Sequence, residues 1–337
     1  MSKVNIEDVA THAGVSVKTV SRVLNNESNV RDKTRTKVLA TIEALGYKPN
    51  LYARRLRQNR SYLIGILYDN PTETYINAML NGALSGCNEQ GYELIIRPVD
   101  YLSADLIKQV TDLVERSKVD GIILSPPLSD NVALIDALNL LNVATVRISP
   151  MHKQGNPYVV CNETDAAKQV VEHFHYLGHQ HIGIIIGHPE HGASQWRLSG
   201  YRQAMESAGI KVLPDWEQQG DFSFESGERC ARKLLTLPER PTAIFASNDA
   251  MAAGVYKVAH QLGIRVPHQL SVIGFDDAPV AGYLWPPLTT VRQPIFDLAK
   301  QAAEQVIEQI AHSDTPVPNR ETLECELVVR HSTSPVV

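Results

Sequence analysis

A chain of 337 residues exceeds what one hydrophobic core usually organises, so at least two domains are expected. Hydrophobic residues make up 43% of the chain and charged residues 20%, which is ordinary for a soluble globular protein. No apolar run approaches the roughly 20 residues of a membrane helix, and the N-terminus lacks the apolar segment of a secretory signal. We therefore expect a cytoplasmic protein with no membrane partner.

The net charge of −5 conceals an asymmetry between two parts of the chain. Residues 1–60 carry 12 Lys and Arg against 5 Asp and Glu, a net charge of +7. The remaining residues carry 20 against 32, a net charge of −12. Because Lys and Arg neutralise phosphates, this division predicts a nucleic-acid-binding head on an acidic body.

Helical periodicity accounts for residues 5–46, where apolar residues recur at three- and four-residue spacing and Gly14 and Gly46 mark helix ends. After about residue 61, short apolar runs alternate with amphipathic stretches. The runs predict strands buried on both faces, at residues 63–67, 121–124, 182–186 and 243–246. The amphipathic stretches predict helices, at roughly residues 75–90, 103–117, 163–177, 196–208 and 249–262.

A second series of strands and helices begins near Tyr158, which indicates two lobes. The fold class predicted is therefore α/β: an all-α helix-turn-helix head and a two-lobed body with parallel sheets. A ligand is expected in the cleft between the lobes, at the carboxyl ends of strands.

The head has the features of a helix-turn-helix. Asn5 can cap the first helix, Gly14 permits a tight turn and Ser16 can cap the second helix. On the second helix Val20, Val23 and Leu24 can face inward. This leaves an outer face near its N-terminal end, formed by Val17, Lys18, Ser21 and Arg22, where a recognition helix meets base edges. The alternative is a helical hairpin whose charged residues are merely solvated.

No cofactor, metal site or enzymatic activity is expected. The chain has neither a GxGxxG nor a GxxxxGK[ST] sequence, and its four cysteines form no C-x-x-C pair. Histidines cluster between His173 and His191, but a turn at Gly178 separates His175 from His179. The adjacent carboxylates Asp276 and Asp277 have no accompanying nucleophile motif. Asp249 is expected to cap a helix that begins at Ala250.

The run from Ile6 to Asn25, together with VRDKTRTKV and LGYKPN, resembles the DNA-binding head of the lactose-repressor (LacI) family of bacterial regulators. The resemblance implies a head over residues 1–49 and a hinge helix over residues 50–60, where Leu56 enters the minor groove. A flexible basic linker is the alternative for the hinge. The residues implied in DNA binding are Ile6, Ser16, Val17, Lys18, Ser21, Arg22, Asn25, Asn50, Ala53 and Leu56. Arg31 departs from the family, because many members place a small capping residue there.

The resemblance extends over nearly the whole chain, through YLGHQHIG, RLSGY, ASNDAMA, SVIGFDD and PPLTTV. It implies a body over residues 61–337, with an N-lobe of about 61–160 and 292–322 and a C-lobe of about 161–291 and 323–337. The effector residues it implies are Asn70, Tyr75, Met79, Ser125, Arg197, Phe222, Asn248 and Asp276. Ser149 departs from the family, because many sugar-binding members carry an aspartate there.

The predicted protein is thus a homodimeric repressor that binds a near-palindromic operator and responds to a small-molecule effector, a sugar. Two alternatives remain open. One is a nucleobase-responsive, corepressed regulator of the same fold. The other is a stand-alone sugar-binding protein, which would need the signal peptide that the sequence lacks.

Overall fold

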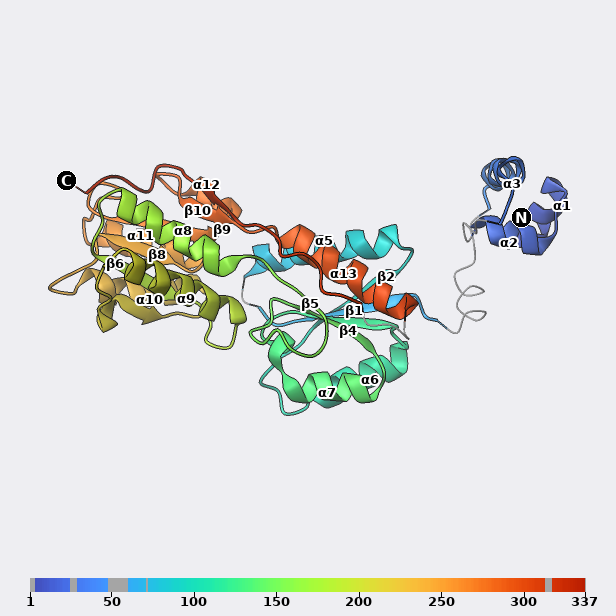
Figure 1. Ribbon diagram of the computed structural model, residues 1–337, viewed down its shortest axis with the longest axis horizontal. Helices are drawn as coiled ribbons and strands as arrows, with labels where there is room; N and C mark the ends of the chain where they lie inside the picture. The colour runs from blue at the N-terminus through green and yellow to red at the C-terminus, as the bar shows by residue number, and fades with distance from the viewer. Residues whose placement is uncertain (1–3, 25–28, 48–59, 71, 313–316, 337) are drawn as a thin grey trace. The chain divides into compact units, whose positions relative to one another are not determined.

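The computed structural model describes residues 4–24, 29–47, 60–70, 72–312 and 317–336. The chain divides into two compact units, a head of residues 1–60 and a body of residues 61–337. The head is helical and the body contains two parallel sheets covered by helices, so the predicted fold class is confirmed (Figure 1). Within the described residues, no helix is both long and apolar enough to cross a membrane.

The head consists of α1 (Ile6–Ala13), α2 (Val17–Leu24) and α3 (Asp32–Leu45), packed around Val9, Val20 and Val38. The predicted cap of α1 is present. The side-chain oxygen of Asn5 accepts hydrogen bonds from the backbone N–H groups of Glu7 and Asp8, at 2.8 and 3.0 Å. Asp8 in turn accepts from the N–H of Asn5 at 2.9 Å, which completes a capping box.

The turn between α1 and α2 also follows the sequence prediction. Gly14 has a φ of 62°, which costs glycine little and lets the chain reverse after α1. Ser16 Oγ then accepts a hydrogen bond from the N–H of Thr19 at 3.1 Å, at the start of α2. Arg31 precedes α3 without a side-chain capping bond, as its departure from the family pattern implied.

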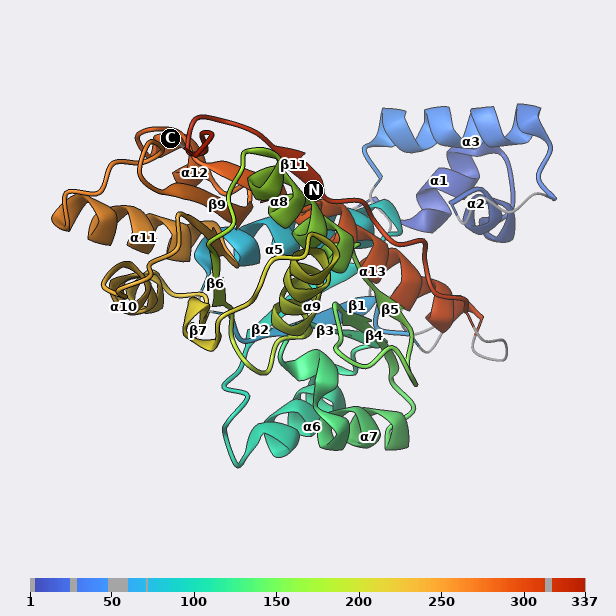
Figure 2. The ribbon, with the colours of Figure 1, turned by 60° about the vertical axis from the view of Figure 1, so that its left-hand side comes forward.

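The first sheet of the body has the strand order β2-β1-β3-β4-β5, all parallel. These strands are β1 (Leu63–Tyr68), β2 (Glu93–Pro98), β3 (Gly121–Leu124), β4 (Ala144–Ile148) and β5 (Tyr158–Val159). One face is covered by α5 (Glu73–Glu89) and α13 (Ile295–Ala311), the other by α6 (Leu106–Ser117) and α7 (Val132–Leu140) (Figures 1 and 2). A short 3-10 turn, η1, covers Leu128–Asp130. We call this layered unit the N-lobe.

The second sheet has the order β11-β10-β9-β8-β6-β7, in which only β11 pairs antiparallel. Its strands are β6 (Ile182–Ile186), β7 (Glu217–Gln219), β8 (Ala243–Ala246), β9 (Ser271–Asp276), β10 (Thr289–Arg292) and β11 (Glu326–Val328). Helices α8 (Glu163–Tyr176) and α9 (Gly192–Ser207) cover one face, α10 (Phe224–Leu235) and α11 (Asp249–Gln261) the other. The short α12 (Pro279–Tyr283) and η2 (Pro214–Trp216) complete this unit, the C-lobe.

The chain passes between the two lobes three times, after β5, after β10 and before β11. Two of the crossing segments are hydrogen-bonded to each other. The N–H of Asn162 donates to the carbonyl of Leu323, and the N–H of Leu323 donates to the carbonyl of Val160, both at 3.0 Å. Asn162 Oδ1 also accepts from the N–H of Cys325 at 2.7 Å. Two of the three crossing segments are therefore joined to each other by hydrogen bonds around an isolated bridge between Cys161 and Leu323.

Candidate functional site

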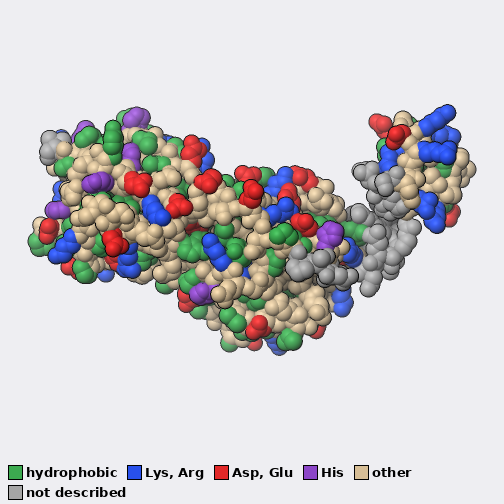
Figure 3. Space-filling view, viewed as in Figure 1, with side chains coloured by type: hydrophobic (Ala, Val, Ile, Leu, Met, Phe, Trp, Pro, Cys, Tyr) green, Lys and Arg blue, Asp and Glu red, His purple; other side chains and the backbone are tan. Residues whose placement is uncertain are grey.

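The first candidate surface is the N-terminal end of α2 in the head. Lys18 is exposed and the side chain of Val17 retains 40% of its accessible surface, whereas Arg22 is half-buried. Figure 3 shows several Lys and Arg side chains on the visible face of the head. A short helix that presents cationic and apolar side chains at its N-terminal end suits contact with phosphates and base edges in a DNA groove.

The second candidate site is a pocket between the lobes. Residues from both lobes and from the crossing segments line it: Asn70, Thr72, Tyr75, Pro126, Ser149, Glu163, His191, Ala193, Arg197, Phe222, Asn248, Asp276 and Gln293. Most of them follow the carboxyl ends of parallel strands or begin the next helix, which is where ligands bind in open α/β folds.

Arg197, on α9, lies in the pocket wall and is almost completely buried. Its Nε donates to Glu163 Oε2 at 2.9 Å, and its Nη1 donates to the carbonyl oxygen of Ser247. Nη2 lies 3.9 Å from Asp276 Oδ1. Burial alone would lower the pKa of Arg197, but the carboxylates of Glu163 and Asp276 outweigh it and raise the pKa. Arg197 is therefore a fixed cation with N–H groups left for a ligand.

Asp276 ends β9 and turns its carboxylate into the pocket beside Arg197. Burial raises the pKa of Asp276 to about 7, with Arg197 opposing the rise and Glu163 adding to it. Its φ of 106° is unusual for a residue other than glycine. Such strain persists where surrounding contacts hold it, and it occurs often at ligand sites.

Asn248 and Phe222 form one corner of the pocket. The Oδ1 of Asn248 accepts from the N–H of Met251 at 2.8 Å and caps α11, while its Nδ2 donates to the carbonyl of Phe222 at 2.9 Å. Phe222 has a φ of 71°. Its ring occupies the space that a side chain at Gly187 would need, so a glycine there lets the ring reach the pocket. Asn248 thus fixes Phe222 and retains one N–H for a ligand.

A row of aromatic rings leads from this corner to the N-lobe. Phe222 contacts His191, whose ring centroid is 5.4 Å away, and His191 contacts His188 at 4.9 Å. His188 Nε2 lies 3.4 Å from the hydroxyl of Tyr101, in the N-lobe. Burial lowers the pKa of His191 to about 3, assisted by His188 and Arg197, so His191 lines the pocket as a neutral ring.

The lobes also meet at the start of α9. A Cβ atom on Gly192 would lie 2.7 Å from the backbone nitrogen of Met151 and 3.0 Å from the carbonyl oxygen of Ser149. The N-lobe loop after β4 therefore packs on the backbone of α9 only because residue 192 is a glycine. This contact and the Tyr101–His188 contact both join the lobes near the pocket.

Two polar atoms in the pocket wall are buried without a hydrogen-bond partner among the described residues, Ser149 Oγ and Gln293 Oε1. The amide nitrogen of Gln293 does donate, to Glu163 Oε1 at 3.2 Å. A buried polar atom without a partner costs about 1–3 kcal/mol. Ligand hydroxyl or N–H groups that bonded to these atoms would recover that cost.

Comparison with known proteins decides the family. Residues 5–50 match the profile described as "Bacterial regulatory proteins, lacI family", and residues 171–333 match that of a periplasmic binding protein-like domain. The repressor PurR of Photobacterium profundum is 34% identical, over 97% of this chain and 98% of its own length. This chain belongs to the lacI family.

Solved structures of LacI-family proteins have the same architecture. The lac repressor dimer bound to operator and the anti-inducer ONPF superposes with a TM-score of 0.77 and 29% identity, covering 99% of this chain and all of that one. The complex of the regulator CelR with cellobiose gives a TM-score of 0.74 and 29% identity, covering 98% of this chain and 99% of that one. LacI-type regulators bind operator DNA as dimers, respond to small molecules and are not enzymes. The predicted family and the predicted lack of enzymatic activity are thus confirmed.

In this LacI-family head, one predicted DNA-binding residue of α2 does not lie on the exposed face where the sequence predicted it. Ser21 was predicted on the outer face of α2, yet it retains only 9% of its accessible surface. Ser21 lies three residues before Leu24, which packs on the head core, and its small side chain is covered on the same flank. Ile6 also packs partly against that core. Four predicted residues, Asn25, Asn50, Ala53 and Leu56, lie outside the described residues.

Six of the eight predicted effector residues line the pocket: Asn70, Tyr75, Arg197, Phe222, Asn248 and Asp276. Met79 and Ser125 do not line it. Met79 lies one helical turn beyond Tyr75 on α5 and packs into the N-lobe core. Ser125 is buried at the end of β3, and its neighbour Pro126 reaches the pocket instead.

The sequence reasoning missed Glu163, His191 and Gln293. Glu163 begins α8 and reads as an ordinary acidic residue in a first helical turn, so its sequence position carries no signal. Asp249 was predicted to cap α11, but Asn248 makes that bond. Asp249 is instead the first helical residue, and its carboxylate accepts from Thr290 Oγ1 at 2.6 Å and the N–H of Ala278 at 2.7 Å.

Proposed function

We propose that this LacI-family regulator is a repressor whose operator binding is controlled by a small, neutral carbohydrate held between the lobes. The observation that carries the proposal is the set of polar groups in the pocket. Arg197 and Asn248 offer N–H donors, while Asp276 and Gln293 offer oxygen acceptors. Each hydroxyl of a sugar is both a donor and an acceptor, so a polyol can use the two kinds of group together.

The charges of the pocket favour a neutral ligand over an acidic one. Glu163 and Asp276 are acidic, Arg197 is the cation among the lining residues, and the ring of His191 is neutral. Arg197 already binds Glu163 at 2.9 Å. A phosphate or carboxylate would therefore have to share the guanidinium of Arg197 with Glu163 and would lie beside a second carboxyl group, that of Asp276. Ser149, where many sugar-binding members carry an aspartate, offers a hydroxyl in place of that carboxylate.

A nucleobase is the second candidate effector. Tyr75, His191 and Phe222 all line the pocket, and aromatic rings favour a flat partner. The sequence identity of 34% to a repressor named PurR is a further reason to test this candidate. The sugar is preferred because donors and acceptors stand together in the pocket wall, which suits hydroxyl groups that act as both.

On the DNA side, we propose that two copies of the chain bind the two halves of a near-palindromic operator. A single short recognition helix such as α2 contacts too few base pairs for useful specificity. Two heads in a symmetric dimer double the number of contacts, and the twofold symmetry of the dimer is matched by a palindromic site. The residues proposed to meet the bases are Val17, Lys18 and Arg22.

Thermal-shift screening of the full chain tests the effector class. The panel contains cellobiose, D-ribose, D-glucose, glucose 6-phosphate, hypoxanthine and guanine. We expect a neutral sugar to raise the melting temperature, because a ligand present at 100 times its Kd stabilises the folded state by about 2.7 kcal/mol. Glucose 6-phosphate should have less effect than glucose. A shift with hypoxanthine or guanine and none with sugars would establish the second candidate instead.

DNA binding is then measured by fluorescence anisotropy with an operator selected from random DNA by the purified protein. The sugar that stabilises the protein should change operator affinity in the wild type but not in Asp276→Asn. Asp165→Asn is the matched control, because the side chain of Asp165 is 65% exposed and pairs only with Lys168 among the contacts described. An unchanged response in Asp276→Asn would place the effector elsewhere.

A further inference from the structure

The turn that carries Asp276 is strained at two consecutive positions. Asp276 has a φ of 106° and Asp277 a φ of 56°, and neither residue is a glycine. Side chains with a Cβ atom rarely adopt such conformations, which persist only where other contacts compensate for the strain. Contacts elsewhere must therefore hold this turn, and with it the pocket carboxylate.

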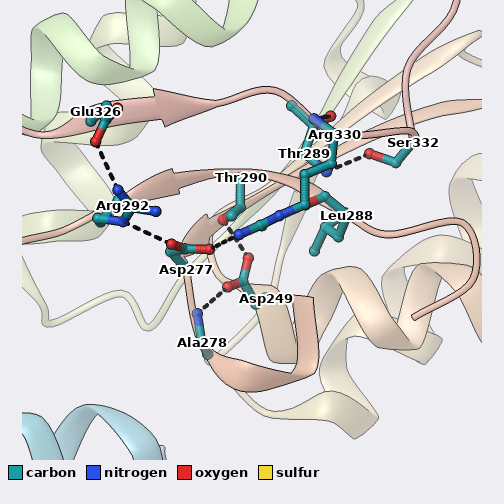
Figure 4. A network of polar contacts seen from close by, with 10 residues as sticks. All are labelled: Asp249, Asp277, Ala278, Leu288, Thr289, Thr290, Arg292, Glu326, Arg330 and Ser332. Carbon is teal, nitrogen blue, oxygen red and sulfur yellow. Dashed lines mark hydrogen bonds and ion pairs between the residues drawn. The ribbon is translucent and has the colours of Figure 1, made fainter. Parts of the chain in front are cut away.

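The side chain of Asp277 makes two contacts that hold this turn. Its Oδ2 accepts a hydrogen bond from Arg292 Nε at 2.8 Å, and its Oδ1 accepts from Arg330 Nη2 at 2.5 Å (Figure 4). Both oxygens of the carboxylate thus face guanidinium groups, while the side chain retains only 12% of its accessible surface. Asp277 is not among the residues that line the pocket, although it follows Asp276 directly.

The two arginines are themselves held by the C-lobe sheet. Arg292 Nη1 donates to Glu326 Oε2 at 2.9 Å, and Arg330 Nη1 donates to the carbonyl of Leu288 at 2.9 Å. Asp276, Arg292 and Glu326 are direct neighbours across β9, β10 and β11. The network therefore runs along the edge of the sheet at which the chain crosses between the lobes.

The other side of the turn is held as well. The N–H of Ala278 donates to Asp249 Oδ2 at 2.7 Å, and the hydroxyl of Thr290 donates to Asp249 Oδ1 at 2.6 Å (Figure 4). The strained turn is consequently fixed by a side chain at Asp277 and by a backbone group at Ala278. Only the first of these attachments can be removed without disturbing the buried Asp249.

We propose that Asp277 is a positioning residue for the effector pocket. Through Arg292 and Arg330 it holds the strained turn so that the carboxylate of Asp276 stays buried beside Arg197. The proposal rests on the proposed function, in which Asp276 binds the effector. The two adjacent carboxylates then have different roles. Asp276 faces the ligand, and Asp277 holds Asp276 in place.

A titration of the full chain tests the proposal without an effector. Asp side chains labelled with 13C at the carboxyl carbon are followed by NMR, and the Asp276 signal is assigned from Asp276→Asn. In the wild type this carboxyl group should titrate near pH 7, because burial raises its pKa to about 7. In the double variant Arg292→Gln with Arg330→Gln, the turn relaxes and water reaches Asp276. Its pKa should then fall toward the ordinary value of 3.8.

The sign of this shift separates positioning from simple electrostatics. The double variant removes two positive charges, and that loss alone can only raise the pKa of a nearby carboxyl group. Movement of the turn would also take Asp276 away from Arg197, whose charge lowers the pKa of Asp276, but burial is the larger of the two influences, so release into water lowers the pKa on balance. A fall in pKa therefore supports the proposal, and a rise or no change overturns it. Arg292→Gln alone is the milder variant if the double variant does not fold, because the side chain of Arg292 is 52% exposed.

Two substitutions at residue 277 separate the effect of losing the carboxylate from the effect of the strained backbone conformation. Asp277→Gly permits the positive φ but removes both acceptors, whereas Asp277→Asn keeps one acceptor. With cellobiose, D-ribose and D-glucose as probes in calorimetry, we expect Kd to rise about tenfold or more in Asp277→Gly and less in Asp277→Asn for a sugar that binds the wild type. Equal affinity in Asp277→Gly and the wild type would overturn the proposal. If none of the sugars binds the wild type, the proposed function fails and the titration alone decides the role of Asp277.

Discussion

Removal of Arg197 should destabilise the body as well as the pocket. The side chains of Arg197 and Glu163 retain 3% and 0% of their accessible surface, and their hydrogen bond measures 2.9 Å. Arg197→Ala leaves Glu163 as a buried charge without its partner, which typically costs about 3–5 kcal/mol. Arg202→Ala is the matched control on the same helix, since Arg202 is 57% exposed and pairs with Glu217 at 2.6 Å. A pair of that kind contributes about 0.2–1 kcal/mol.

Urea unfolding followed by circular dichroism measures the loss of stability in Arg197→Ala and in Arg202→Ala. We expect the free energy of unfolding to fall several-fold more in Arg197→Ala than in Arg202→Ala. The double variant Arg197→Met with Glu163→Leu should recover a large part of the loss, because apolar side chains of similar volume can replace a buried pair. Equal losses in the two single variants, or no recovery in the double variant, would refute the reasoning from burial.

Three further predictions concern the pH dependence, the lobe contact and the head. Because burial raises the pKa of Asp276 to about 7 in the folded state, its contribution to stability is present at low pH and is lost as pH rises from about 4 to 7. Asp276→Asn should therefore gain stability relative to the wild type over that range in urea titrations, and Asp165→Asn should not. Gly192→Val should weaken binding of the cognate sugar about tenfold in calorimetry, because the added side chain displaces Met151 and with it the loop after β4. Gly282→Val, where an added Cβ atom would have no neighbour within 4 Å, is the control, and equal effects would contradict the argument from close packing at Gly192. Arg22→Ala should lose about 1–3 kcal/mol of preference for operator over random DNA in anisotropy titrations, and full retention of that preference would move the reading surface away from α2.

Features that depend on residues close in sequence were predictable. The cap at Asn5, the turn at Gly14 and the cap at Ser16 each involve partners within four residues. Uniformly apolar runs predicted β1, β3, β6 and β8, because a strand that is covered on both faces has apolar side chains on both. The family motifs then supplied Arg197, Asn248 and Asp276.

Features that depend on distant partners were not predictable from the sequence. Glu163 gains its role from Arg197 and from Gln293, which lies on another crossing segment. Ser21 was assigned to the wrong face because α2 is short, and its burial, which leaves 9% of its surface accessible, is decided by tertiary packing rather than by the helical pattern. The capping role was misassigned to Asp249 because Asn and Asp can both cap a helix, and in the structure Asn248 accepts the bond from Met251.

The threefold passage of the chain between the lobes has a consequence for synthesis on the ribosome. Helix α5 packs on α13 so closely that Gly82 meets the backbone of Phe296, about 200 residues further along the chain. The C-lobe sheet likewise needs β11, which follows α13. The N-lobe cannot bury this face of α5 while the nascent chain lacks α13, although domains generally fold as units during translation. The newborn polypeptide therefore carries exposed apolar faces until translation is almost finished, and a prematurely terminated product would be a substrate for chaperones and proteases rather than a regulator with one intact lobe.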